Sequence, residues 1–176
     1  MISWIKGKLV SSWQVNNKYY LLIDCQGLGY EIQTLESVIK DIESNKISKN
    51  NIILWLKHIK KEDSDMLFGF FLKDQRDFFV QILDIKGIGS QIGMSLLNKF
   101  SLNQIINAIT NNDKKMISSV QGIGQKMTER IILELKNKVI SKQIEDDNLV
   151  KNDFFLENRE LNSIFEDIDL TLQSLN

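Results

Sequence analysis

Proline is missing from this chain, and cysteine and histidine occur only once each. Each of these scarcities excludes a kind of structure or site. There is no proline, so turns must be made by Gly, Asn, Asp and Ser. The only cysteine is Cys25, which rules out an internal disulfide; it lies in an apolar stretch and is expected to be a buried, inert thiol. The only histidine is His58, and one His with one Cys excludes most zinc sites. His58 lies in an alternating apolar segment, which favours a place on a sheet face.

Long hydrophobic runs are absent too. No stretch of the sequence is apolar enough over a sufficient length to span a membrane, and the N-terminus lacks the apolar core of a secretory signal. We therefore expect a cytoplasmic protein.

The net charge is only −1, but it is unevenly distributed. Residues 1–75 carry a net charge of +1, residues 76–140 carry +4 and residues 141–176 carry −6. The acidic end of the chain therefore masks a basic central region, which is where an anionic partner such as a nucleic acid is expected to bind.

An internal repeat is the most informative feature that is present. Gly87-Ile88-Gly89 is followed 35 residues later by Gly122-Ile123-Gly124. In both copies apolar residues recur four, eight and nine positions after the central isoleucine, which predicts one buried face of a helix. The chain therefore contains two copies of a helix, a Gly-x-Gly hairpin and a second helix. The repeated apolar positions are Ile88, Ile92, Leu96 and Leu97, and then Ile123, Met127, Ile131 and Ile132.

Such hairpins predict a phosphate-binding chemistry. Glycine adopts positive φ and permits a close approach of another backbone. The first amides of the following helix lack intrahelical partners, and with the helix dipole they form an anion site. Two such sites in tandem can hold nucleic-acid backbone without reading bases. A single copy would more often be a helix cap with a tight connection, and the matched second copy favours the binding role.

Other phosphate-binding motifs do not fit. The third glycine of a dinucleotide fingerprint is missing, no β-run precedes either turn, and no Gly-Lys-Ser/Thr follows as in a P-loop. Lys86 and Lys99 are weaker candidates than the hairpins themselves. The candidate DNA-binding residues are Gly87, Ile88, Gly89, Ser90, Gln91, Gly122, Ile123, Gly124, Gln125, Lys126 and Arg130.

The first seventy residues predict short strands with one small helix. This pattern is typical of a Greek-key barrel of the oligonucleotide/oligosaccharide-binding (OB) type. Gly7 is expected to be a bend or bulge within the first strand, and Gln26-Gly27 to begin a turn. The expected strands are 4–10, 19–25, 30–33, 52–59 and 66–70, and the expected helix is 36–43.

Helical patterns follow, so the expected fold class is α+β. Asp74 is predicted to cap a helix that ends near Leu83, and Ser101 to cap another. Asn111-Asn112-Asp113 is predicted to break the chain, with helices over 114–120 and 125–139 on either side of the second hairpin.

The end of the chain is acidic. Residues 141–160 are polar without clear periodicity and predict a flexible linker, and from Leu161 a new apolar stripe predicts the first helix of a further module. The expected domains are a barrel over 1–72, a tandem helix-hairpin-helix domain over 73–140, the linker over 141–160 and an incomplete helical module over 161–176.

Together these segments resemble the RuvA family, bacterial proteins that bind Holliday junctions. The resemblance covers about residues 1–140 and implies an OB barrel, a tandem helix-hairpin-helix domain and a mobile three-helix domain. It also implies a homotetramer, or an octamer, that holds a four-way junction open and square. The implied partners are the RuvB hexamer, which uses ATP, and RuvC. The matching segments are Met1-Ile2 through Lys6-Gly7, Gly27-Leu28-Gly29-Tyr30-Glu31, Leu67-Phe68-Gly69-Phe70 and both hairpins.

The resemblance also gives a meaning to the acidic segment near residue 62. By itself, Lys61-Glu62-Asp63-Ser64-Asp65 is typical of a solvated hairpin turn. In the family a carboxylate pair at this point forms an acidic pin at the tetramer centre, and Glu62 and Asp63 match that pair. Repulsion between such a pin and DNA phosphates discourages strands from closing over the centre.

Three departures from the family pattern change what is expected. Ser90-Gln91 stand where the family often has Pro-Lys, and Gln125 replaces a frequent lysine. Fewer neutralised phosphates predict a shallower salt dependence of DNA binding. The chain also ends at Asn176, inside the first helix of the domain that contacts RuvB in the family. The sequence leaves open whether it recruits RuvB or is a truncated subunit that binds junctions alone.

A DNA repair enzyme is the alternative from a different class. Helix-hairpin-helix glycosylases and nucleases need a catalytic lysine or aspartate beside the hairpin, or clustered acidic metal ligands. Asp84 and Asp113 are isolated, so the sequence favours a binding module with no catalytic residue, metal or cofactor of its own. The tryptophans Trp4, Trp13 and Trp55 are expected in the barrel core or in an interface rather than as base-stacking platforms.

Overall fold

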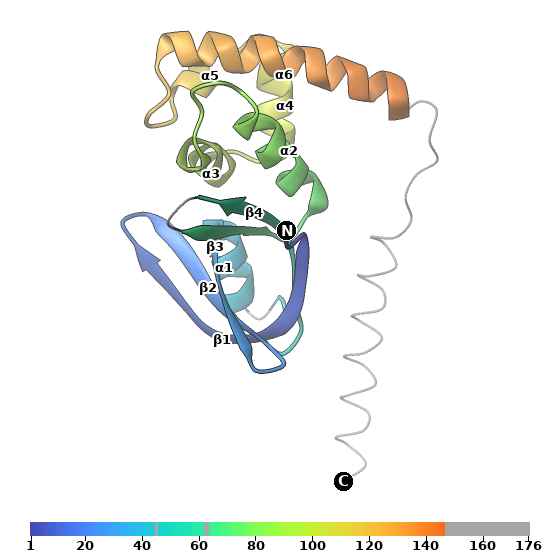
Figure 1. Ribbon diagram of the computed structural model, residues 1–176. Coiled ribbons are helices and arrows are strands. Elements are labelled where there is room, and N and C mark those ends of the chain that lie inside the picture. The colour runs from blue at the N-terminus through green and yellow to red at the C-terminus, as the bar shows by residue number, and fades with distance from the viewer. Residues whose placement is uncertain (45, 62–63, 147–176) are drawn as a thin grey trace. The chain divides into compact units, whose positions relative to one another are not determined.

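The first part of the chain is a closed β-barrel. The computed structural model describes residues 1–44, 46–61 and 64–146 (Figure 1). Its strands follow the order β1-β2-β3-β5-β4, and the parallel pairing of β3 with β5 closes a sheet whose other pairs are antiparallel. The expected OB-type barrel is thereby confirmed. The strands are β1 (Trp4–Val15), β2 (Lys18–Cys25), β3 (Leu28–Thr34), β4 (Ile52–Lys60) and β5 (Asp65–Phe70).

Alternation along the strands fills the barrel interior. In β4 the buried residues are Ile52, Leu54 and Leu56, while the residues between them are partly exposed. Gly69 of β5 faces the same interior, where a Cβ would lie only 2.6 Å from a methyl carbon of Ile32. Only glycine fits at this point of the core.

Strand β1 is longer than predicted. It was expected to end at Val10 but continues to Val15. The reason lies in Asn16 and Asn17, which both take positive φ, 47° and 60°, and so form the two-residue turn that suits a twisted β-hairpin. The turn expected at Gln26-Gly27 is confirmed, again with positive φ at both residues.

The irregularity of β1 was predicted at the wrong residue. The register with β2 shifts between Leu9 and Ser11, not at Gly7. Gly7 is required because a Cβ there would come within 2.3 Å of the Asp24 carbonyl oxygen. This glycine therefore permits a close approach of two strands rather than a bulge.

Cys25 is half-buried, not buried as expected, because it is the last residue of β2. Its Sγ donates a hydrogen bond to the Lys6 carbonyl oxygen at 3.1 Å. Partial burial, and with it the negative charge of Asp24, raises the pKa of the thiol. That this thiol is inert stays a prediction.

One helix is inserted in the barrel and the others follow it. The helix α1 (Glu36–Glu43) has the predicted bounds and buries Val38 and Ile42. No helix in the described part of the chain combines the length and the apolar character needed to cross a bilayer. The later helices are α2 (Lys73–Leu83), α3 (Ser90–Lys99), α4 (Leu102–Thr110), α5 (Lys114–Ser118) and α6 (Gln125–Asp146).

The helix caps agree with the sequence in one place and differ in another. Ser101 caps α4 in a full capping box with Gln104, as the Ser-x-x-Gln spacing allows. Asp74 does not cap α2, because the extended residue before that helix is Leu72. Asp74 lies instead in the first turn, where a carboxylate favours the positive end of the helix dipole.

Helix α6 continues further than predicted. It was expected to end near residue 139 and runs to Asp146, into the first part of the predicted linker. Residues 140–146 contain no glycine or proline to end a helix, and Lys, Gln and Glu favour its continuation. The rest of the predicted linker and the predicted helix from Leu161 lie outside the described residues.

The helical part packs on the outer face of the barrel. Phe79 of α2 lies against Phe68 and Phe70 of β5, with ring centroids 5.1 Å apart in both pairs. Gly93 of α3 lets the two helices approach, because a Cβ there would lie 2.9 Å from the Phe79 ring. Figure 1 shows α2 and α3 nearest the barrel strands. This packing fixes the start of α3, where the first hairpin ends.

Candidate nucleic-acid interface

The first hairpin joins α2 to α3. Gly87 has φ of +88°, a conformation that favours glycine, and Gly89 is the extended residue before α3. Ile88 between them is only 7% exposed and its amide donates to the Ile85 carbonyl at 3.0 Å. The isoleucine thus anchors the turn in the core, and the glycine backbone remains at the surface.

The second hairpin repeats this geometry. Gly122 has φ of +87°, and Ile123 is 5% exposed with its amide bonded to the Val120 carbonyl, again at 3.0 Å. It joins α5 to α6 as the first joins α2 to α3. The repeat recognised in the sequence is therefore a repeat of conformation, burial and hydrogen bonding.

The amides after each hairpin are arranged as an anion site requires. In α3, the first amides bonded back to the Gly89 carbonyl are those of Ile92 and Gly93, so the amides of Ser90 and Gln91 precede the bonded turn. In α6, Thr128 bonds to the Gly124 carbonyl at 2.9 Å. Both sets of leading amides lie at the positive end of a helix dipole.

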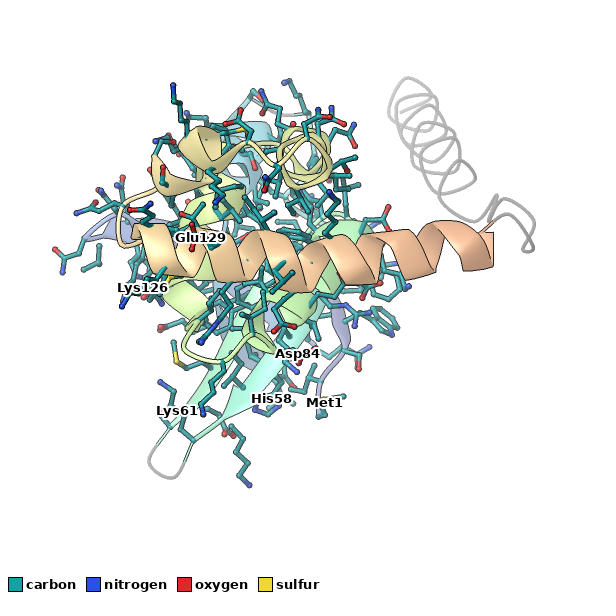
Figure 2. The ribbon with its side chains drawn as sticks, turned by 90° about the horizontal axis from the view of Figure 1, so that it is seen from above. Met1, His58, Lys61, Asp84, Lys126 and Glu129 are labelled. Atoms are coloured by element: carbon teal, nitrogen blue, oxygen red, sulfur yellow. The ribbon has the colours of Figure 1, made fainter. Side chains whose placement is uncertain are left out.

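The side chains named as DNA-binding candidates differ in their surroundings. Gln125 and Lys126 are exposed on the first turn of α6, and Figure 2 shows Lys126 at that end of the helix. Ser90 is half-buried. The side chains of Ile88 and Ile123 are buried, so these two residues can offer a ligand only their backbone.

Gln91 does not extend freely from the first hairpin. Its side-chain amide exchanges two hydrogen bonds with that of Gln33 on β3, at 3.2 and 3.4 Å. Gln33 is 5% exposed, so this is a nearly buried link between barrel and helix. Sequence reasoning missed it because the partners are 58 residues apart and neither belongs to a motif.

The other end of α3 is also tied to the barrel. Asn98 accepts a hydrogen bond from the Glu36 amide at 2.8 Å, which satisfies one of the free amides at the start of α1. In α1 a hydrogen bond from Lys40, one turn on, lowers the pKa of the Glu36 carboxyl. Helix α3 is therefore held at both ends by side-chain amide groups.

Two cations join the helix-hairpin-helix repeats to each other. Arg130 of α6 donates from Nη1 to the Lys86 carbonyl at 2.7 Å, at the entry of the first hairpin. Lys99 of α3 donates to the carbonyl and the hydroxyl of Ser119, before the second hairpin. The sequence placed Arg130 beside the second hairpin, but its guanidinium lies at the first hairpin.

The acidic pin was predicted between β4 and β5, whose ladder the structure describes up to this point. Lys60 pairs with Asp65 at the end of the ladder, and the Lys61 amide donates to the Ser64 carbonyl at 2.9 Å. Figure 2 shows Lys61 at this end of the molecule. Glu62 and Asp63 themselves lie outside the described residues.

His58 has the expected place on a sheet face, where its Nε2 lies 3.4 Å from an Asp65 carboxylate oxygen.

None of the three tryptophans lies in the barrel core. Trp4 is 56% exposed. Trp13 stacks on Tyr20 with centroids 5.6 Å apart, and the Arg76 guanidinium lies 5.8 Å from the centre of the Trp55 ring. The alternation of β4 explains this for Trp55, because Leu54 and Leu56 take the inward positions. The expectation of a place in an interface stays a prediction.

Comparison with known proteins follows the same division of the chain. A family model described as the RuvA N terminal domain matches residues 1–69, and one described as a SAM-like Helix-hairpin-helix tandem matches residues 79–137. The first corresponds to the barrel and the second to the repeated hairpins.

Relatives match nearly the whole chain. It is 80% identical to the "Holliday junction branch migration complex subunit RuvA" of Prochlorococcus marinus subsp. pastoris (strain CCMP1986 / NIES-2087 / MED4), across all of this chain and 80% of that protein. Proteins of the same name from Prochlorococcus marinus strains MIT 9312 and NATL1A are 57% and 37% identical; the matches cover 100% and 99% of this chain, and 78% and 76% of those proteins. With a matching barrel, matching hairpins and relatives at this identity, the chain belongs to the RuvA family.

Proposed function

We propose that this chain binds four-way (Holliday) junction DNA and acts as the DNA-holding subunit of a branch migration complex in recombination and repair. The observation that carries the proposal is the pair of equivalent hairpins, with φ of +88° and +87° at their first glycines. The junction itself is inferred from the names of relatives, one of which is 80% identical to this chain over the 176 matched residues.

The hairpins would bind phosphates through their backbone. Each presents leading helix amides at a dipole end, and the neighbouring Gly89 and Gly124 have open space where a Cβ would stand. Lys126 and Arg130 add positive charge, and Lys86 and Lys99 lie on the same helical domain. Such contacts hold the DNA backbone in register without reading its sequence.

The shape of the bound junction would come from assembly. A homotetramer places four barrels around one centre, and Glu62 and Asp63 of each copy would form the acidic pin there. Carboxylates close to phosphates repel them most strongly at low ionic strength. In this division of labour the hairpins supply affinity and the pin keeps the crossover open.

The motor would be a separate protein. The resemblance assigns ATP hydrolysis to a RuvB hexamer, and with it the pumping of the junction arms, so we propose no catalytic residue in this chain. The test is branch migration of a synthetic junction with this chain, RuvB and ATP together. Branch migration is expected only when this chain, RuvB and ATP are all present. Branch migration by this chain alone would contradict the assignment of the motor to RuvB.

Junction binding is tested by comparing a synthetic four-way junction with linear duplex of the same length and sequence across a salt series. A clear preference for the junction at moderate salt is expected, with affinity falling as salt rises because each phosphate contact releases counterions. Equal affinity for both DNAs would contradict junction recognition. Metal-dependent cleavage of either DNA would favour the alternative of a repair enzyme.

A further inference from the structure

The first hairpin is not followed by a cation in the first turn of its helix, although it shares the geometry of the second; the exposed Lys86 precedes its first glycine. Residues 87–91 are Gly, Ile, Gly, Ser and Gln, whereas the second hairpin is followed by the exposed Lys126. The side chain of Gln91 is bound to Gln33. From residues 87–91, which include the first turn of α3 up to Gln91, a phosphate at the first hairpin would therefore meet only uncharged groups.

A cation from the second repeat lies at this hairpin. The Arg130 Nη1 donates to the Lys86 carbonyl at 2.7 Å, and it would lie 3.8 Å from a Cβ placed on Gly87. The corresponding position of the first repeat, 35 residues earlier, is Ser95, so the second hairpin receives no such arginine in return.

The reciprocal contact from α3 is of a different kind. Lys99 donates to both oxygens of Ser119, three residues before Gly122, and so closes the end of α5. Arg130 instead reaches the residue next to Gly87. Of these two links, only the arginine brings its charge to a hairpin glycine.

We infer that Arg130 serves the first hairpin as both its positioning residue and its phosphate-binding cation. The bond to Lys86 fixes the entry to the Gly87 turn. A guanidinium carries five N–H donors in a planar fork, so it can hold a carbonyl and still present donors to a phosphate. Each hairpin then has a cation from α6, which is Lys126 at the second hairpin and Arg130 at the first. This inference rests on the proposed function.

The test follows individual backbone amides of the ¹⁵N-labelled full chain by NMR while a short DNA duplex is added. Three variants are compared with the wild type: Arg130→Gln, Arg130→Lys and Lys126→Gln, the last being the matched control at the second hairpin. Arg130→Gln is expected to abolish the DNA-induced shifts of Gly87 and Gly89 and to leave those of Gly122 and Gly124. Lys126→Gln should do the reverse.

Affinity and the free protein give two further readouts. Each glutamine variant is expected to bind duplex about tenfold more weakly, with the salt slope reduced by about 0.9 for the lost phosphate contact. Without DNA, Arg130→Gln should already shift the amides of residues 86–89, because the bond to the Lys86 carbonyl is gone. Arg130→Lys, which keeps the charge, should recover part of the affinity and of the hairpin shifts.

The possible failures are distinguishable. If wild-type hairpin amides do not respond to DNA at all, the proposed function fails. If they respond but Arg130→Gln alters the second hairpin and spares the first, the function stands and the assignment of Arg130 is overturned. If Arg130→Gln does not fold, Arg130→Lys decides: the same fold with both hairpins unchanged in the free and bound protein also overturns the assignment.

Discussion

At the scale of single residues, the two glycines of each hairpin have different tasks. Gly87 and Gly122 take a positive φ that L side chains rarely adopt. Gly89 and Gly124 do not, and in the part of the chain that the structure describes nothing lies within 4 Å of where their Cβ would stand. The first glycine therefore makes the turn, and the second leaves free space where the helix amides begin.

The different tasks of the two glycines predict different effects when each is replaced by alanine. Gly122→Ala should lower the free energy of unfolding by about 1–2 kcal/mol, because alanine is strained at this φ. Gly124→Ala should leave stability nearly unchanged but weaken DNA binding about tenfold, because a methyl group keeps phosphate away from the leading amides. Urea denaturation and DNA titration of both variants measure the two effects.

The pair in the first hairpin supplies the matched control. Gly87→Ala and Gly89→Ala should repeat the same contrast, since the two turns share their conformation. Wild-type DNA affinity in both Gly89→Ala and Gly124→Ala would contradict a close approach of the DNA backbone to these residues.

Gln91 shows where prediction from single residues ends. The family resemblance placed it where a lysine is common, and Gln91 was named among the candidate DNA-binding residues. The structure pairs it with the nearly buried Gln33, far away in sequence. A motif describes its own neighbours in the chain, and nothing in it identifies a hydrogen-bond partner on a strand 58 residues away.

At the scale of elements, α3 is the part that connects the barrel to the first hairpin. It packs on α2 through Gly93, bonds to β3 through Gln91 and bonds to α1 through Asn98. Since its first turn also carries the leading amides, the same helix sets where the first proposed phosphate site would lie relative to the barrel.

The link between Gln33 and Gln91 is therefore expected to show strong coupling. Either single change, Gln33→Met or Gln91→Met, should lower the free energy of unfolding by about 1–3 kcal/mol, because the remaining amide loses its partner in a nearly buried site. The double variant should lose less than the sum of the two, with a coupling energy of about 1–2 kcal/mol. Denaturant unfolding of the four chains completes this cycle.

DNA binding in the same four chains separates the two roles of Gln91. If its side chain acts through Gln33, then Gln91→Met should not weaken DNA binding further in the Gln33→Met background. An equal loss of affinity in both backgrounds would mean that the Gln91 side chain contacts DNA directly. Additive effects on stability would mean that the link between Gln33 and Gln91 is unimportant.

Elements were predictable where their signals were local. The helix at 36–43, the cap at Ser101 and both hairpins follow from short spacings of apolar, capping and glycine residues, and all are confirmed. The end of β1 was missed because residues 11–14, three of which are polar, belong to a hairpin whose turn is Asn16-Asn17. The end of α6 was missed because a loss of amphipathic pattern does not by itself stop a helix without glycine or proline.

At the scale of the whole molecule, charge is separated along the chain. The helical region 76–140 is positive by four charges, while the barrel region 1–75 is nearly neutral. The proposed pin lies on the barrel, between the ends of β4 and β5, and the proposed phosphate sites lie on the helical domain. Attraction and repulsion toward DNA would thus come from different parts of one subunit.

Neutralising the pin should therefore change discrimination more than affinity. The variant Glu62→Gln/Asp63→Asn is expected to bind a four-way junction as tightly as the wild type or more tightly. Its binding to linear duplex should improve more, so the ratio of the two affinities falls. The fall should be largest at low salt, because the screening length shrinks from about 30 Å at 0.01 M to about 8 Å at 0.15 M. Titrations of both DNAs across a salt series measure the ratio.

The matched control removes the same two charges elsewhere on the barrel. Glu31 on β3 and Glu43 at the end of α1 are both exposed. Glu31→Gln/Glu43→Gln therefore changes the net charge equally, and any general gain in DNA affinity from lost negative charge appears in both variants. A fall in discrimination confined to the Glu62/Asp63 variant would assign it to the place of those carboxylates. If the two variants behave equally, or if the Glu62/Asp63 variant binds more weakly with unchanged discrimination, the segment around Glu62 and Asp63 is only a solvated turn. The shape of a bound junction would then have to come from the arrangement of the hairpins alone.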